Sequence, residues 1–317
     1  MKKQNINLYL ASPRGFCAGV DRAVKIVEES IKKFGAPVYV RHEIVHNKDV
    51  VNSLANIGAV FVDEVIEAPI DRPIIFSAHG VAKIVVKEAN SRKMISIDAT
   101  CPLVTKVHNE IIRHYELGRH VLLVGHNNHP EVIGTMGQVP KENITLIETE
   151  EDAQTVEVKN PNQLAFATQT TLSVDDTNAI LTILKNRFPN IKGPTAEDIC
   201  YATTNRQEAV KSLAKICDCI LVIGAENSSN SLRLVEVALS NGVKNSFLIP
   251  HERALDDFLN TYDPIQFPNI GLTAGASAPE TLVQALIEKL KTNFNVNEIN
   301  NEVIKENITF NLPKILR

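Results

Sequence analysis

The chain has 317 residues, of which 44% are hydrophobic and 22% are charged, a composition typical of a folded globular protein. Its formal net charge of −4 argues against a general nucleic-acid-binding protein, because such a protein needs an excess of Lys and Arg to neutralise phosphates. No apolar stretch is long enough for a signal peptide or a membrane span, so we expect a cytoplasmic protein that does not enter a membrane. The five cysteines are widely spaced, and in a reducing compartment this favours metal binding, catalysis or burial over disulfide bonds.

A weak internal repeat begins at three of these cysteines. Cys17, Cys101 and Cys200 each precede a stretch whose apolar residues recur every three or four positions, which predicts a helix with one apolar face. Each predicted helix is followed by a short apolar run typical of a buried parallel strand. These runs are 38–40, 121–124 and 220–223. A second apolar run in each unit ends in small polar residues, at 74–80, 164–171 and 270–277.

The repeat predicts an α/β fold in which three similar units, with small and mainly parallel sheets, are arranged with pseudo-threefold symmetry around a central cavity. The strand predicted at 6–11 precedes the first cysteine, so we expect it to complete the last unit. The expected bounds are 17–100 for the first unit, 101–199 for the second, 1–16 with 200–292 for the third, and 293–317 for an Asn-rich C-terminal tail.

A polar loop follows the first strand of each unit at a similar distance from the cysteine. His46 and His129 lie 29 and 28 residues after the first and second cysteines, and Ser228 lies 28 residues after the third. In parallel α/β sheets, ligands bind where strands end and helices begin, because unpaired backbone N–H groups converge there. The repeat therefore predicts that these loops face one ligand site.

The repeated cysteines suggest a metal site. A thiolate just before a helix is favoured by the helix dipole, which suits a metal ligand. The intervals of 84 residues from Cys17 to Cys101 and 99 residues from Cys101 to Cys200 are unlike the close pairs of a zinc ribbon. Three thiolates without a nearby fourth ligand suit a cubane iron–sulfur cluster in which one iron is open, that is, without a protein ligand. The alternative is a zinc ion bound by three cysteines and a water molecule. Cys217 and Cys219 have no counterparts and are expected in the core.

Hydroxyl, amide and imidazole groups at the strand ends suit an anion such as a diphosphate, which needs several donors and some positive charge. The candidate donors are His46, His79, His129, Ser228, Ser229, Asn230 and Ser277. A single histidine at such a place is more often a hydrogen-bonded structural group than a ligand contact. Glu131 is either a solvated loop carboxylate or, inside an anion pocket, a proton donor whose pKa is raised by burial.

The three cysteine motifs, at 13–20, 98–104 and 200–207, resemble those of the hydroxymethylbutenyl diphosphate reductase family. Five loops match this family as well. They are 42–47, 125–131, 168–173, 227–231 and 274–279. The resemblance covers nearly the whole chain, apart from the segment beyond about residue 292.

This resemblance implies one [4Fe-4S] cluster per chain, held by Cys17, Cys101 and Cys200, with one open iron. It implies reductive removal of the hydroxyl of (E)-4-hydroxy-3-methylbut-2-enyl diphosphate, giving isopentenyl and dimethylallyl diphosphate. An external one-electron donor such as ferredoxin or flavodoxin is expected. The resemblance assigns the diphosphate to His46, His79, Ser228, Asn230 and Ser277, with help from Ser229 and Thr171. It assigns proton relay to Glu131, His129 and Thr170, with His129 also close to the substrate.

Two other functions remain open from the residues alone. One is a dehydratase without redox chemistry, in which the open iron acts as a Lewis acid. The other is an iron–sulfur or zinc sensor in which the cysteines are structural or regulatory. A requirement for a reductant distinguishes the first alternative, and diphosphate binding distinguishes the second.

Overall fold

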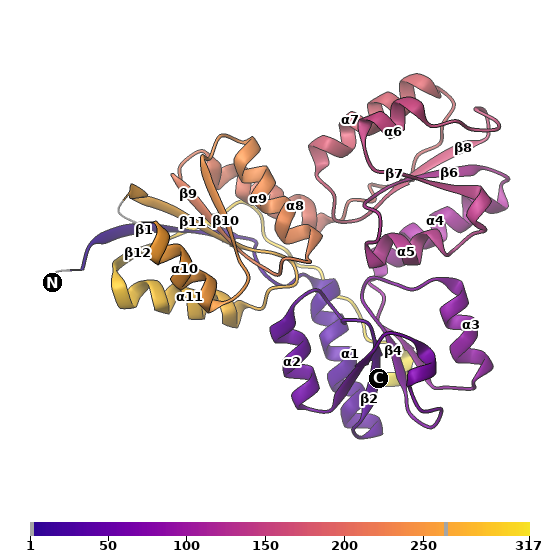
Figure 1. The fold of residues 1–317 in the computed structure, drawn as a ribbon, viewed down its shortest axis with the longest axis horizontal. Helices are drawn as coiled ribbons and strands as arrows, with labels where there is room; N and C mark the ends of the chain where they lie inside the picture. The colour runs from indigo at the N-terminus through magenta and orange to yellow at the C-terminus, as the bar shows by residue number, and fades with distance from the viewer. Residues whose placement is uncertain (1–2, 263–265) are drawn as a thin grey trace. The chain divides into compact units, whose positions relative to one another are not determined.

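In the computed structural model, which describes residues 3–262 and 266–317, the strands form three sheets (Figure 1). All neighbouring strand pairs in these sheets are parallel, as predicted. The described residues divide into two compact units. The first unit contains 3–17, 46–48, 201–262 and 266–308, and the second contains 18–45, 49–200 and 309–317.

The first unit is built on a five-stranded sheet with the order β10-β9-β11-β1-β12. Its strands are β1 (Asn5–Ser12), β9 (Cys219–Ile223), β10 (Asn245–Ile249), β11 (Asn269–Ala274) and β12 (Asn295–Glu302). Helices α8 (Tyr201–Ala214) and α9 (Ser229–Ser240) pack on one face of this sheet, and α10 (Glu252–Thr261) and α11 (Glu280–Asn293) pack on the other (Figure 1). Because β9 is covered on both faces, all five of its residues are apolar and buried.

The second unit contains two smaller sheets. The four-stranded sheet has the order β3-β2-β4-β5, and the three-stranded sheet has the order β7-β6-β8. The strands are β2 (Val38–Arg41), β3 (Ala59–Val62), β4 (Ile74–Phe76), β5 (Ser96–Asp98), β6 (His120–Val124), β7 (Ile144–Ile147) and β8 (Leu164–Thr168). The α-helices are α1 (Ala18–Phe34), α2 (Lys48–Asn56), α3 (Lys83–Ser91), α4 (Pro102–Glu116), α5 (Pro130–Met136), α6 (Glu150–Thr155) and α7 (Val174–Arg187). Short 3-10 turns lie at Val65–Glu67, Lys141–Asn143 and, near the C-terminus, Lys314–Leu316.

The three sheets share one strand order, which confirms the repeat seen in the sequence. In each sheet the first strand after a cysteine helix, namely β2, β6 or β9, lies between the next two strands along the chain. A fourth position beside the third strand is occupied by β5 in one sheet and by β1 in another. In the three-stranded sheet this position holds an isolated parallel bridge between Ala165 and Lys192. From each fourth position the chain continues to a cysteine of the repeat.

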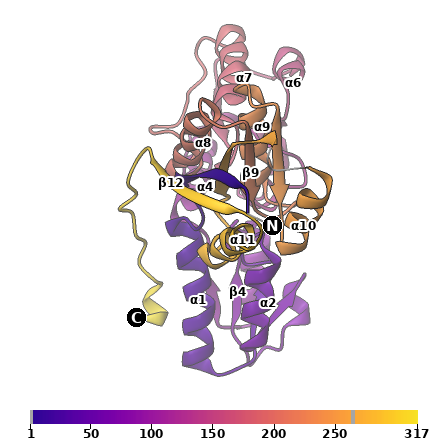
Figure 2. The same ribbon diagram turned by 90° about the vertical axis from the view of Figure 1, so that its left-hand side faces the viewer.

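The segment expected as a tail instead contributes an edge strand. β12 pairs with β1 over eight residues, from Asn5 opposite Asn295 to Ser12 opposite Glu302 (Figure 2). The amide of Asn297 donates to Asn7 (3.0 Å), and the amide of Asn7 donates to Asn269 in β11 (3.0 Å). The sequence did not predict this strand because an exposed edge needs no apolar alternation, and side-chain amides bond across the strands instead.

The C-terminal residues after β12 run without a further strand or α-helix. The last nine residues belong to the second unit and contact α1, where Arg22 Nε donates to Asn311 O (2.8 Å) and Lys33 Nζ donates to Ile315 O (2.6 Å) (Figure 2). Among the residues that the structure describes, none of the helices has both the length and the apolar character that a membrane crossing requires.

Candidate active site

The three repeated cysteines occupy equivalent positions in the fold. Cys17 and Cys200 directly precede α1 and α8, and Cys101 is the N-cap residue of α4. One cysteine N–H donates to a carbonyl at the end of each sheet. The acceptor is always the second residue after β4, β8 or β11, which are the third strands after Cys17, Cys101 and Cys200 along the chain. These bonds run from Cys17 to Ala276 (3.3 Å), from Cys101 to Ala78 (2.9 Å) and from Cys200 to Thr170 (3.1 Å). The same backbone contact therefore places a thiol at the same strand end three times.

The donor set has the chemistry that an iron–sulfur cluster requires. Cys17, Cys101 and Cys200 are half-buried and form no disulfide within the described chain. Cys217 and Cys219 are buried in the core, as predicted, and burial raises the pKa of each thiol to about 12. In the described residues no group of three or more His, Cys, Asp or Glu side chains lies close enough together to hold a metal ion, so the fit to a cluster lies in the chemistry of the three thiols and in their repeated position in the fold. Three accessible thiols at helix starts fit soft-metal ligation, whereas the two core thiols do not.

A group of polar side chains in the first unit surrounds the start of α9. Ser228 is the N-cap residue, and its Oγ accepts from the N–H (3.3 Å) and the Oγ–H (3.0 Å) of Ser231. Ser277 Oγ lies 3.5 Å from Ser228 Oγ and donates to the carbonyl of His46 (3.0 Å). Asn227 Nδ2 lies 3.3 Å from His46 Nδ1. The expected diphosphate residues His46, Ser228 and Ser277 are thus in contact with one another at a helix N-terminus, where backbone N–H groups favour an anion.

Asn230 carries an unsatisfied amide within this group. Its side chain is buried, with 6% of the residue exposed, and neither its Nδ2 nor its Oδ1 has a hydrogen-bond partner among the described residues. A buried amide without a partner costs about 1–3 kcal/mol, so a water molecule or a polar ligand that supplies the missing bonds would be stabilised here. Ser229, the first residue of α9, is half-buried beside it.

Ser231 completes this group, although the sequence did not single it out. It is fully buried, and two glycines at the ends of β9 and β11 leave the space for it. A Cβ on Gly224 or Gly275 would lie 2.1 Å or 2.0 Å from Ser231 Oγ, far inside contact distance. The signal available in the sequence was a glycine directly after each of two buried strands, since such glycines mark places where another part of the chain packs closely against the backbone.

A second group, in the second unit, is centred on Glu131. Its two carboxylate oxygens accept from the backbone N–H (2.7 Å) and the Oγ1–H (2.8 Å) of Thr170. Glu131 is only 3% exposed, so the interpretation as a solvated loop carboxylate is wrong. Burial raises the pKa of Glu131 to about 7, although the bonds from Thr170 oppose the shift, and the nearby Asp198 carboxyl raises it a little further.

The two histidines of this group lie next to each other. His129 is the N-cap residue of α5, and its Nδ1 accepts from the N–H of Glu131 (3.1 Å). The neutral ring of His129 therefore carries its proton on Nε2. The rings of His79 and His129 meet edge to face with 5.9 Å between their centroids, and Ser77 Oγ lies 3.5 Å from His79 Nδ1. The structure thus brings His79, His129, Glu131 and Thr170 together.

Two further buried residues of the second unit escaped the sequence analysis. Gln169 Nε2 donates to Thr171 Oγ1 (3.0 Å), and Gln169 Oε1 accepts from the N–H of His126 (3.0 Å). The buried Asp198 forms an ion pair with the partly exposed Lys106 (3.1 Å), and burial raises the pKa of the Asp198 carboxyl. Their positions beside Thr170 and Cys200 were the available signal, but isolated polar residues in a sequence rarely reveal their burial.

Comparisons with known proteins show the family of this chain. Residues 8–291 match the LytB protein family. The 4-hydroxy-3-methylbut-2-enyl diphosphate reductase of Roseobacter denitrificans is 54% identical over 317 residues, which cover 100% of this chain and 99% of the relative. The enzyme of that name from Hyphomonas neptunium is 56% identical over 314 residues, with coverages of 99% and 98%.

Solved structures give the same result. The E-1-hydroxy-2-methyl-but-2-enyl-4-diphosphate reductase of Plasmodium falciparum has a TM-score of 0.90 and 35% identity, covering 100% of this chain and 97% of that one. A second structure, of (E)-4-hydroxy-3-methyl-but-2-enyl diphosphate reductase, described as the terminal enzyme of the non-mevalonate pathway, has a TM-score of 0.64 and 30% identity. It covers 90% of this chain and 99% of that chain.

Together, the fold and the similarities define an α/β oxidoreductase, a reductase of the non-mevalonate pathway. The family match spans most of the chain, and the curated relatives match it from end to end. The chain belongs to the LytB protein family.

Proposed function

We propose that this chain reduces (E)-4-hydroxy-3-methylbut-2-enyl diphosphate to isopentenyl diphosphate and dimethylallyl diphosphate. The carbon–oxygen bond of the allylic alcohol breaks, two electrons and two protons are taken up, and the hydroxyl leaves as water. The relatives that are 54–56% identical over the full chain carry the name of this reaction's enzyme. Ferredoxin, flavodoxin or a similar one-electron carrier would supply the electrons.

The cofactor we propose is one [4Fe-4S] cluster on Cys17, Cys101 and Cys200. The observation that carries this proposal is that the N–H groups of the three cysteines make equivalent hydrogen bonds, each to a backbone carbonyl two residues after a buried strand. Such a cluster, with one iron lacking a protein ligand, would supply electron transfer and a Lewis-acidic position for the hydroxyl. Thiols outside disulfides also suit a reducing compartment such as the cytoplasm.

The protein's own groups would hold the diphosphate and move the protons. Ser228, Asn230 and Ser277 offer donors at the start of α9, and the partnerless amide of Asn230 supports a polar ligand there. His46, His79, Ser229 and Thr171 would add further donors. Binding at a helix N-terminus neutralises part of the diphosphate charge without a Lys or Arg side chain.

Glu131 would hold the transferable proton. With a pKa of about 7, its carboxyl is about half protonated at neutral pH, which is the useful range for a general acid. Thr170 Oγ1 can donate to the carboxylate or accept from the carboxylic acid by rotating its hydroxyl, so the two side chains can exchange a proton. His129, whose ring proton is on Nε2, would complete the relay.

The test is anaerobic purification followed by iron and sulfide analysis, and a turnover assay with a dye-linked reductant. We expect about four iron and four sulfide per chain, and conversion of the diphosphate substrate only when the reductant is present. Cys17→Ser, Cys101→Ser and Cys200→Ser should each lose the cluster or make it labile, while Cys217→Ser and Cys219→Ser should keep it. Turnover without a reductant would support a dehydratase, and zinc in place of iron would remove the redox proposal.

A further inference from the structure

Arg206 is a fully buried cation in the first unit that the proposed chemistry does not use. Arg206 lies on α8, and among the described residues it has the largest side chain that is fully buried. A guanidinium has five N–H donors and a permanent charge, so its burial requires acceptors for all five and a counter-charge. Its position therefore reflects a structure built around it.

Two of these acceptors are backbone carbonyls of the loop that carries Cys17, and a third is Ala202 O on α8, which accepts from Nη1 (3.0 Å). Arg206 Nε (3.1 Å) and Nη2 (2.7 Å) both donate to the carbonyl of Gly15, and Nη2 also lies 3.3 Å from the carbonyl of Phe16. These are the two residues before Cys17. A fork with two donors on one carbonyl fixes that peptide in direction as well as in distance.

The opposite side of the same loop is held by β11. The N–H of Gly15 donates to Ala274 O (3.0 Å), and the N–H of Cys17 donates to Ala276 O (3.3 Å). Gly15 itself has a φ of +64°, which disfavours a side chain. The backbone before Cys17 is thus bonded on both sides, with the strand end as one anchor and Arg206 as the other.

The counter-charge comes from the C-terminal segment. Glu306 Oε1 lies 3.1 Å from Arg206 Nη1, Oε2 lies 3.4 Å from Nη2, and Asn205 Nδ2 also donates to Oε1 (3.0 Å). The neighbours of Glu306 are exposed, whereas its own side chain is only 16% exposed. Among residues 302–309, Glu306 is the only one that is not exposed.

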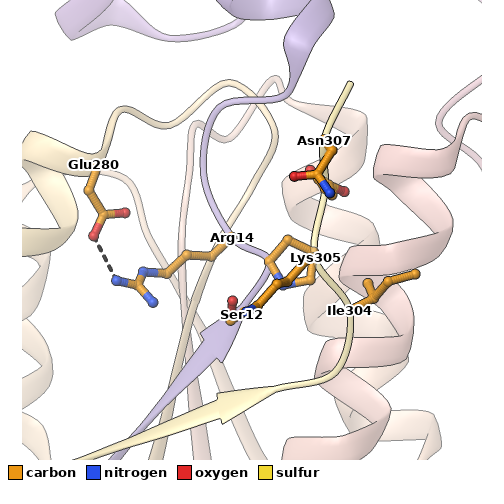
Figure 3. Close-up of a pocket in the computed structure, with 8 residues that line it drawn as sticks. Ser12, Arg14, Glu280, Ile304, Lys305 and Asn307 are labelled. Atoms are coloured by element: carbon orange, nitrogen blue, oxygen red, sulfur yellow. Dashed lines mark hydrogen bonds and ion pairs between the residues drawn. The ribbon is translucent and has the colours of Figure 1, made fainter. Parts of the chain in front are cut away.

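Figure 3 shows Ile304, Lys305 and Asn307 of this segment beside Ser12 and Arg14. Residues 304–307 line a cavity of about 460 Å³ together with residues 12–14 and Glu280. The charge of Arg14 is balanced by an ion pair with Glu280 (2.7 Å). The segment is thus a strap beside the Cys17 loop with solvent on its outer face.

We propose that Arg206 and Glu306 are positioning residues for Cys17. The strap supplies Glu306, Glu306 neutralises and orients the buried guanidinium, and the guanidinium fixes the Gly15–Phe16 backbone. Cys17 is then presented at a defined place before α1. The role of Cys17 as a cluster ligand rests on the proposed function, whereas the fixing of its loop does not.

The test compares Glu306→Gln with Glu302→Gln in the full-length protein. Glu302 is an exposed residue of the same segment that pairs with Lys305 (3.6 Å), so it controls for the loss of one negative charge. Hydrogen exchange of the peptide containing Gly15 and Cys17 should become about tenfold faster in Glu306→Gln, because the loop loses a charged anchor. Exchange in β6 and β9 should stay at the wild-type rate. Release of iron from the holoenzyme to a chelator should accelerate by about the same factor.

A double variant separates positioning from general stability. Arg206→Met with Glu306→Gln removes both buried charges, so thermal stability should recover toward that of wild type while the Cys17 loop still exchanges rapidly. Arg206→Lys, which keeps the charge but lacks the fork, should also loosen the loop. The proposal is overturned if Glu306→Gln exchanges like Glu302→Gln, or if its exchange rises equally in all strands. If Cys17→Ser keeps full iron and sulfide, the cluster assignment fails, but the exchange result still decides the positioning role.

Discussion

Glu131 and Thr170 are joined by two hydrogen bonds, one from the backbone N–H (2.7 Å) and one from the side-chain hydroxyl of Thr170 (2.8 Å). Thr170 also accepts, through its carbonyl, the N–H of Cys200 (3.1 Å). One residue thus links the buried carboxyl to the backbone of a proposed cluster ligand. The proposed roles of the Glu131 carboxyl and of the polar side chains at the start of α9 can be tested separately.

Glu131→Gln should separate turnover from binding. The amide can still accept from the Thr170 N–H, and its NH2 can donate to Thr170 Oγ1 after the hydroxyl rotates, so the local structure should persist. The transferable proton is lost, and turnover should fall by about 10²–10⁴-fold. Substrate affinity should hold or improve. Steady-state assays with a dye-linked reductant and a binding titration provide the measurement, and His46→Ala should show the opposite pattern, with weaker binding. Wild-type turnover of Glu131→Gln would show that the proton comes from elsewhere.

The pKa of Glu131 should also appear in the pH dependence of stability. Because its folded-state pKa of about 7 lies above the ordinary value of 4.5, folding favours the protonated form. The contribution is complete below about pH 4.5 and is lost as the pH rises to about 7, a change of up to about 3 kcal/mol in the free energy of unfolding. Denaturant titrations of wild type and Glu131→Gln between pH 4.5 and 8 should diverge in this window. Parallel curves would mean that the carboxyl is ionised throughout.

Asn230→Ala should weaken diphosphate binding without destabilising the ligand-free protein. The variant removes a buried amide that has no partner in the described chain, so the free energy of unfolding should stay equal or rise by about 1 kcal/mol. Affinity for the substrate, or for inorganic diphosphate as a probe, should fall about tenfold or more. Asn241→Ala is the matched control, because Asn241 Nδ2 donates to Val237 O (2.9 Å) at the far end of α9. That control should lose about 0.5–1.5 kcal/mol of stability and keep its affinity. The reverse pattern would exclude a ligand at Asn230.

Gly275→Ala should displace the start of α9. The new Cβ would lie 2.0 Å from Ser231 Oγ, so Ser231 and the Ser228 that it supports must move. We expect a loss of about 1–3 kcal/mol in stability, as for overpacked cores, and weaker diphosphate binding. Ser231→Ala in the same chain removes the clashing oxygen and should restore part of the stability, since the remaining Cβ contact is 3.1 Å. Calorimetry of the single and double variants checks this. Equal stabilities would show that the backbone relaxes without cost.

The sequence predicted most of the fold because the signals were local and repeated. Buried strands such as β6 and β9 consist largely of continuous apolar runs, which a sequence shows directly. β12 was not predicted because it is a largely exposed edge strand, and such a strand needs no regular apolar pattern. The three-unit boundaries and the pseudo-threefold arrangement stay predictions.

The candidate site could be predicted in part for a similar reason. His129, Glu131 and Thr170 stood out by motif, but the burial that raises the pKa of Glu131 depends on contacts from a separate loop. Ser231 and Arg206 were missed because their importance lies in fit and burial. A serine under two glycines and an arginine inside a core have no distinctive sequence pattern.

The position of β1 bears on how the chain acquires its structure during synthesis. β1 contains residues 5–12, yet both neighbours in its sheet, β11 and β12, lie at 269–274 and 295–302. Strand pairs so distant in sequence form slowly, and a ribosome releases the N-terminal partner first. The two sheets of the second unit consist of strands from 38–168 and can form while β1 still lacks its partners. The β1 strand and the adjacent Cys17 thiol therefore stay without their sheet neighbours until nearly the whole chain has been made. During that time the strand is open to aggregation and the thiol to premature oxidation.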